Sequence, residues 1–447
     1  MSTQQYGHPL TQSPSHYCQQ KLSMYPPNQT EHSVGIAALG QDKVLYIVIK
    51  SDGHNLTPTY ATLVDAMYSQ FPQAPISIEM YNWDNTSGGS QSSGSNPRIL
   101  AKFATYLDLF YTAINRWKSV RLDAPLISLV VPLTEQKYPS GKPTSLESVA
   151  IKDTDSVRDM NMFMRFMSIL WSGNAWSFSQ FSIDTYRAFN KQIFPDLPYS
   201  RLTHLDVEST VTAALVHEIL SEAFGITKCR ISDVTSPGPS RNCLDAHTPN
   251  LEYLQLDIDT MDFDKAKSTG AIVSILNKLV APALTDLRIG YEDRWSGTVF
   301  TGLCQRSQFK LETLHLNNVS MSPRHVEQIL ILNPTLRELV IASQTSIQDD
   351  EPQILLTEDI LQKFIGGKTI VPDLECLAIN ITAVETESGW FRRMVRDRFR
   401  HGSLRQVKIN DAQCLEERDL NALVELASYK LSLWLDGERY VDPRWHW

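Results

Sequence analysis

The chain of 447 residues lacks the features that mark secreted, membrane-spanning and zinc-binding proteins. Its six cysteines are scattered, with no C-x-x-C pair and no histidine at metal-ligand spacing, so neither a disulfide framework nor a zinc site is expected. There is no apolar run of about eighteen residues, and the start of the chain has neither the positive charge nor the apolar stretch of a secretion signal. We therefore expect reduced thiols, no membrane contact, and a cytoplasmic or nuclear location.

The sequence also has no excess of basic residues and no complete catalytic motif. Lysine and arginine number 41 against 50 acidic residues, a net charge of −9, which argues against nucleic acid as the partner. The GKT at 367–369 has Gln362 where a phosphate-binding loop needs glycine, and VHEILSE has Ser221 where a zinc protease needs a second histidine. No G-x-S-x-G is present. We expect no enzyme activity, no cofactor and no metal.

Two segments are too polar to bury much surface. Residues 1–40 are rich in Gln, Ser and Pro, which predicts a disordered tail. The stretch DNTSGGSQSSGSNP at 84–97 predicts a disordered surface loop. Folded structure is therefore expected in the remainder of the chain.

A short apolar phrase with the spacing L-x-x-L-x-L recurs through the rest of the chain. Its last two apolar residues alternate with polar ones, which is typical of a short strand with one buried face. Successive copies start 24 to 38 residues apart, and such a series indicates a repeat architecture. The eleven copies are Trp117/Val120/Leu122, Leu146/Val149/Ile151, Phe178/Phe181/Ile183, Leu202/Leu205/Val207, Ile226/Cys229/Ile231, Leu251/Leu254/Leu256, Leu284/Leu287/Ile289, Leu311/Leu314/Leu316, Leu336/Leu339/Ile341, Leu374/Leu377/Ile379 and Leu404/Val407/Ile409.

Helical patterns lie between the phrases. Ser322 is a good N-cap residue and Pro323 a good first helical residue for a helix up to residue 332. Thr357 is a similar cap for a helix that stops at Gly366, and residues 416–428 open with acidic side chains and carry an apolar stripe. The repeating unit is therefore a strand followed by a helix.

One such unit buries too little apolar surface to offset the entropy of ordering it, so neighbouring units must stack. We predict an α/β fold, a leucine-rich-repeat solenoid of the ribonuclease-inhibitor-like horseshoe type, with parallel strands on the concave face and helices on the convex face. It spans residues 41–447: atypical N-terminal repeats over 41–125, repeats over 126–411, and a C-terminal cap over 412–447.

The order of several phrases resembles the F-box leucine-rich-repeat protein family of mushroom-forming fungi. The resemblance spans roughly residues 43 to 411 and rests on VLYIVIKSDG, FYTAINRWKSVRLDAP, HTPNLEYLQLDI, LVAPALTDLRIG, FKLETLHLNNVSMSPRHVEQILILNPTLRELVIA and VPDLECLAIN. It implies a protein–protein interaction module like the substrate-recognition domain of a ubiquitin-ligase adaptor. The F-box itself, a helical segment led by Leu-Pro, is not visible in this chain.

The expected partner is therefore an unidentified protein substrate. A Skp-type adaptor and a cullin are expected partners only if an F-box exists upstream. The alternative is an F-box-less leucine-rich-repeat scaffold or inhibitor with no link to ubiquitination.

Residues beside the buried strand positions point onto the concave face and are the predicted partner-binding residues. Rim loops are an alternative binding surface, and simple solvation is another. The predicted residues are His204, Asp206, Glu208, Tyr253, Gln255, Asp257, Asp286, Arg288, Thr313, His315, Asn317, Glu338, Gln406, Lys408 and Asn410.

The segment 390–400 predicts an amphipathic helix with an arginine-rich face. Its inward residues are Phe391, Met394, Val395 and Phe399. The outward arginines are candidates for an acidic or phosphorylated partner, or form a plain solvated face. They are Arg392, Arg393, Arg396 and Arg400.

Overall fold

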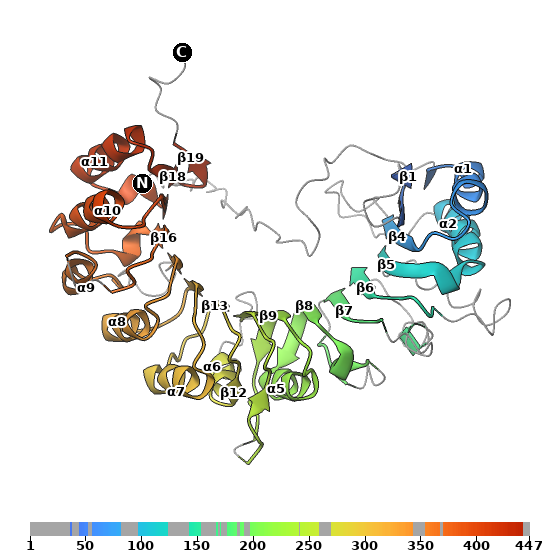
Figure 1. The fold of residues 1–447 in the computed structure, drawn as a ribbon, viewed down its shortest axis with the longest axis horizontal. Helices are drawn as coiled ribbons and strands as arrows, with labels where there is room; N and C mark the ends of the chain where they lie inside the picture. Colours follow the sequence, from blue (N-terminus) through green and yellow to red (C-terminus); the bar gives the residue numbers. More distant parts are fainter. Residues whose placement is uncertain are drawn as a thin grey trace, which may run out of the picture.

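The computed structural model shows how these repeats are arranged (Figure 1). It describes residues 36–37, 44–51, 56–81, 97–123, 143–152, 167–168, 170, 177–185, 188–191, 197–240, 242–258, 270–342, 354–366 and 370–440. The predicted disordered tail therefore lies outside the described residues except for 36–37, and the predicted loop at 84–97 lies outside them except for its last residue.

Within the described residues, seventeen strands form one sheet. Neighbouring strands are parallel from β2 (Leu45–Ser51) to β18 (Ser432–Leu435), and antiparallel where β1 (Ile36–Ala37), β3 (Leu56–Thr57) and β19 (Glu438–Arg439) join its two ends. The strands between β3 and β18 in this sheet are β4 (Ile76–Tyr81), β5 (Trp117–Asp123), β6 (Ser148–Lys152), β7 (Gln180–Asp184), β8 (His204–Thr212), β9 (Lys228–Thr235), β11 (Tyr253–Asp257), β13 (Asp286–Gly290), β14 (Thr313–Asn317), β15 (Glu338–Ala342), β16 (Cys376–Asn380) and β17 (Gln406–Asn410).

The apolar phrases set the register of this sheet. Leu287 lies beside Leu314 and Leu314 beside Leu339, so equivalent phrase residues of successive repeats form continuous buried rows. Every residue of the eleven phrases is at most 2% exposed, and the predicted strand positions are confirmed. Apolar burial is therefore what fixes each strand against the next.

Helices cover one side of the sheet. In Figure 1 the strands follow the inner side of an open arc and the helices lie along its outer side, so the core runs between the two layers. The helices are α1 (Tyr60–Val64), which continues into the π-helix η1 (Asp65–Gln70), α2 (Pro97–Tyr111), α5 (Ala213–Glu222), α6 (Ala271–Leu276), α7 (Gly297–Ser307), α8 (Pro323–Leu332), α9 (Glu358–Lys363), α10 (Trp390–His401) and α11 (Glu417–Ser428). A separate pair of short parallel strands, β10 (Ala246–His247) and β12 (Leu279–Val280), lies outside the large sheet.

The described chain is thus an α/β structure with a long, mostly parallel sheet. The predicted helix starts are confirmed at α8, where Ser322 is the N-cap and Pro323 the first residue, and at α9, where Thr357 holds the N-cap position. At α9 the side chain that accepts from the helix N-terminus is a different one, because Glu385 Oε2 accepts from the backbone N–H of Glu358 at 2.8 Å. None of the described helices has the length and hydropathy needed to cross a membrane.

Candidate functional site

The fifteen predicted partner-binding residues all lie in strands, on the face of the sheet opposite the core. They alternate with buried residues on β8, β11, β13, β14, β15 and β17, and each is itself partly buried. Such alternation leaves polar side chains on one face of every strand because successive side chains point to opposite sides. Their role in binding stays a prediction.

The register brings most of these residues together. Tyr253 lies beside Asp286, and in the next row Gln255 lies beside Arg288, which lies beside His315. The three residues on β17 are separated from this group by β16, whose side chains on the same face include Ala378. We call the predicted residues on β8 to β15, together with the side chains that contact them on the same face, the inner-face network. The predicted residues in it are His204, Asp206, Glu208, Tyr253, Gln255, Asp257, Asp286, Arg288, Thr313, His315, Asn317 and Glu338.

Arg230 on β9 is the cation at one end of this network, and it was not among the predicted residues. Its Nη1 donates to Glu208 Oε1 at 2.8 Å and lies 3.4 Å from Asp206 Oδ1. Burial raises the pKa of Asp206 to about 6, and Arg230 opposes this rise. A signal for Arg230 is present in the sequence, since it stands between the buried phrase residues Cys229 and Ile231.

A chain of polar contacts continues along β11. The hydroxyl of Tyr253 donates to Gln255 Oε1, and Gln255 Nε2 donates to Asp257 Oδ2 at 2.6 Å. Arg288 on β13 donates from Nε and Nη2 to the two carboxylate oxygens of Asp286, at 3.0 and 2.9 Å. Its guanidinium lies 5.2 Å from the ring centre of Tyr253, close enough for a cation–π contact that links the two strands.

His315 closes the network on β14. Its Nε2 lies 3.5 Å from Glu338 Oε1 on β15, and this contact is the main reason why the pKa of Glu338 is lowered. At the other end, burial lowers the pKa of His204, whose Nδ1 lies 2.8 Å from the hydroxyl oxygen of Thr203. The network therefore contains both charge signs, held in place by contacts across neighbouring strands.

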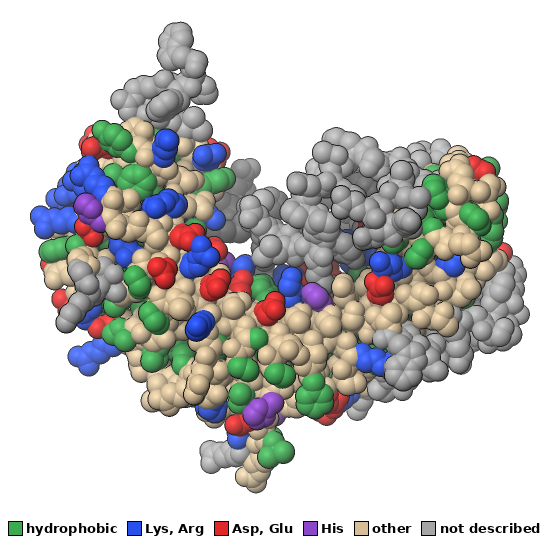
Figure 2. All heavy atoms as spheres, viewed as in Figure 1, with side chains coloured by type: hydrophobic (Ala, Val, Ile, Leu, Met, Phe, Trp, Pro, Cys, Tyr) green, Lys and Arg blue, Asp and Glu red, His purple; other side chains and the backbone are tan. Residues whose placement is uncertain are grey.

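The inner edge of the arc shows the same mixture in Figure 2, where acidic, basic and histidine side chains follow one another. Charged groups that are already fixed by partners lose little freedom when another surface binds them. In the described part of the chain, no three His, Cys, Asp or Glu side chains are placed to hold a metal ion. The arrangement is suited to recognising polar side chains of another macromolecule.

Asp206 provides a test of the electrostatics of the network. Its pKa of about 6 lies above its ordinary value, so ionisation costs folding stability as the pH rises through that range. We expect Asp206→Asn to increase the free energy of unfolding by on the order of 1–3 kcal/mol near neutral pH and to lose this advantage below about pH 4. Urea unfolding at both pH values measures the difference; equal stability of the two proteins at neutral pH would contradict it.

The predicted arginine-rich helix is α10, and its apolar face is confirmed. Phe391, Met394 and Val395 are buried, and Phe399 packs against the core. The four arginines predicted to point outward differ in their contacts. Two of them contact α11: Arg392 Nη1 lies 3.1 Å from Asp419 Oδ1, and Arg396 Nη2 lies 3.8 Å from Glu425 Oε2. Arg393 lies over the Trp390 ring, and Arg400 is exposed.

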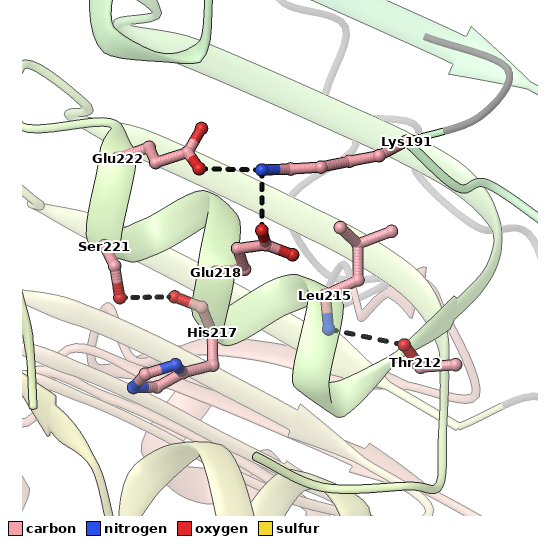
Figure 3. A network of polar contacts seen from close by, with 7 residues as sticks. All are labelled: Lys191, Thr212, Leu215, His217, Glu218, Ser221 and Glu222. Atoms are coloured by element: carbon pink, nitrogen blue, oxygen red, sulfur yellow. Dashed lines mark hydrogen bonds and ion pairs between the residues drawn. The ribbon is translucent and has the colours of Figure 1, made fainter. Parts of the chain in front are cut away.

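A second polar cluster lies on the outer side, at α5 (Figure 3). Lys191 Nζ contacts Glu218 Oε1 at 2.8 Å and Glu222 Oε1 at 2.7 Å, which ties the segment before β8 to the helix. Figure 3 also shows the ring of His217 extending away from Lys191, and Ser221 donates its hydroxyl to the His217 carbonyl at 2.8 Å. These contacts join chain segments to each other, and we assign the cluster a structural role.

Comparisons with known proteins do not add a functional assignment, so the function is argued from the residues described above. No protein-family model matches the chain, and a search of curated proteins finds no match either.

Proposed function

We propose that the chain is a leucine-rich-repeat solenoid that binds another protein on its inner face, as the substrate-recognition module of an F-box-type ubiquitin-ligase adaptor. The solenoid is supported by repeated strand–helix units in continuous parallel register and by the arc in Figure 1. The ligase role is supported by the family resemblance of the phrases over roughly residues 43 to 411.

The inner-face network is the observation on which the binding proposal depends. It occupies a sheet face that none of the described helices covers, while the helices pack on the opposite side. A partly buried set of both charge signs fits a protein surface with complementary charges. Such a set gives specificity, because a wrong partner leaves desolvated charges without a counterpart.

The size of the network also fits a protein partner. Its six strands, β8, β9, β11, β13, β14 and β15, are separated by about 4.8 Å each, so the network spans roughly 24 Å across and about 16 Å along the strands. This footprint is on the order of 400 Å², half of the ~800 Å² that each partner contributes to a standard interface. The bound protein must therefore also contact a rim of the arc or the strands on either side.

A pair of matched substitutions tests the inner face. Thr313→Arg places a long cation within the network, and Thr298→Arg places the same side chain on exposed α7. We expect proteins that co-purify with the tagged wild-type chain to co-purify with Thr298→Arg as well. The dissociation constant of a purified partner should be at least about tenfold higher for Thr313→Arg than for the wild type. Weaker binding by Thr298→Arg and unchanged binding by Thr313→Arg would instead indicate that the partner binds the outer face.

The ligase role is tested separately. We expect a Skp-type adaptor and a cullin among the co-purifying proteins, and a rise in partner abundance when the gene is deleted. A partner that binds the inner face but keeps its abundance in the deletion strain would support a scaffold or inhibitor instead.

A further inference from the structure

A local concentration of positive charge lies on α10 and the turn after it. Residues 390–405 contain six arginines and one aspartate, in a chain whose net charge is −9. Figure 2 shows lysine and arginine side chains gathered on the outer surface at the α10–α11 end of the arc. This patch lies on the outer side of the arc, whereas the inner-face network follows its inner side.

Three of the six arginines have structural roles. Arg392 and Arg396 pair with acidic residues of α11, as described above. Arg398 is only 3% exposed, and its Nη2 donates to the carbonyl oxygens of Val371 and Pro372, each at 2.7 Å. Arg392 and Arg398 hold α10 against its neighbours, and Arg396 lies in a partly exposed ion pair, so the proposed surface does not rest on these three side chains.

The other three arginines, Arg393, Arg400 and Arg405, are exposed. Arg393 and Arg400 are seven residues apart, which places them on the same face of the helix and roughly 10 Å apart along its axis. Arg405 follows the helix, and its Nη1 donates to the carbonyl oxygens of Gly402 at 3.2 Å and Leu404 at 2.9 Å. Asp397, which is partly buried, is the one acid in this segment.

Arg393 is positioned in advance for recognition. Its guanidinium carbon lies 5.0 Å from the ring centre of Trp390, so the aromatic ring supports one face of the group. A guanidinium stacked in this way keeps its N–H edge free for two parallel hydrogen bonds to a carboxylate. Its side chain also loses less freedom on binding than an unsupported arginine would.

We propose that the exposed face of α10, with Arg393 and Arg400, binds an acidic segment of another protein. Arginines separated by roughly 10 Å match carboxylates three residues apart in a polyproline II segment, where three residues make one turn of about 9 Å and the two carboxylates therefore point to the same side. A single phosphate would instead be best held by arginines that converge on one point. A long polyanion such as nucleic acid would be repelled by the rest of this acidic chain. This surface is independent of the inner face and adds a second contact to the proposed function.

The test uses the full chain and a fluorescein-labelled peptide with glutamate at every third position, followed by fluorescence anisotropy. We expect the wild type to bind this probe, and Arg393→Glu/Arg400→Glu to weaken binding by about tenfold or more. The control Lys310→Glu/Arg324→Glu makes the same charge change at two exposed residues, and we expect it to weaken binding by less than about threefold. A copy of the peptide with glutamine at every glutamate should not bind.

Further arms separate the alternatives. Equal weakening by both double variants would overturn the proposal, because it would indicate only a long-range effect of net charge. Tighter binding of a monophosphorylated peptide or an oligothymidylate than of the glutamate peptide would overturn the assignment to carboxylates. Arg393→Gln/Arg400→Gln removes the two positive charges without adding negative ones, so it is the milder change. If this variant binds the peptide as tightly as the wild type does, the proposal is also overturned. Thr313→Arg on the inner face should leave peptide binding unchanged, so the two binding surfaces are tested independently.

Discussion

Replacing Glu292 with alanine is expected to lower the free energy of unfolding by about 4 kcal/mol. Glu292 follows β13 and has no exposed surface. Its carboxylate accepts backbone N–H groups from Gly270 at 3.0 Å, Ile272 at 3.1 Å, Val273 at 3.3 Å and Arg294 at 2.9 Å. Alanine would leave these four donors without their acceptor in the interior of the repeat.

The loss should be large because Glu292 takes the place of a local cap. Helix α6 begins after Gly270, whose φ of 76° is left-handed and which has no side chain to accept from the helix N-terminus. The carboxylate of Glu292 supplies that acceptor from the next repeat. Burial raises the pKa of Glu292, and the backbone N–H groups oppose this rise by favouring the charged form.

Urea unfolding of two further variants distinguishes this role from general damage. Glu292→Gln keeps one acceptor oxygen but turns an NH₂ toward N–H donors, so its stability should lie between those of wild type and Glu292→Ala. Glu327→Ala removes a glutamate that pairs with Lys363 on the outer helices and should cost less than about 1 kcal/mol. A loss below about 1 kcal/mol for Glu292→Ala would show that the carboxylate is not needed as a cap.

The sequence predicts strands well here because the buried positions repeat locally. A phrase such as Phe178/Phe181/Ile183 indicates its own strand, and each of these side chains is buried as expected. The last parallel strand, β18, was not identified as a repeat strand, although Leu433 and Leu435 pair with Val407 and Ile409. The reason is that Lys430 stands where the phrase begins with an apolar residue, and the neighbouring Leu431 is buried in its place.

Contacts between repeats are less predictable than strands because they depend on how the helical insertions place one repeat on the next. The same alternation rule that selected Asp206 applies to Arg230, yet only the register shows that Arg230 lies beside two carboxylates. Glu292 stands in a polar turn, GYEDRW, where the sequence alone gives no sign that it is buried. Its partners at 270–273 are defined by the packing of α6, which no local pattern specifies.

The arginines of α10 show the same limit and lead to a second large effect. The sequence places Arg392 on the outward face with Arg393 and Arg400, but Arg392 Nη1 lies 3.1 Å from Oδ1 of Asp419, which has no exposed surface. Truncating one partner of a buried pair leaves the other charge uncompensated. We therefore expect Arg392→Ala to lower the free energy of unfolding by about 3 kcal/mol near neutral pH, the low end of such losses because Arg392 is partly exposed.

The pH dependence of this loss identifies its cause. Burial raises the pKa of Asp419 and Arg392 opposes the rise, so removing Arg392 should raise this pKa further. The ionised carboxylate then costs stability as the pH rises through its folded-state pKa, and the cost disappears as the pH falls and the group is protonated. The loss caused by Arg392→Ala should thus be smaller at about pH 5 than at about pH 7.5, and Arg392→Leu/Asp419→Leu should be more stable than Arg392→Ala alone. An equal loss at both pH values, measured by urea unfolding, would contradict the role of the ion pair and return Arg392 to the set of residues available to a partner.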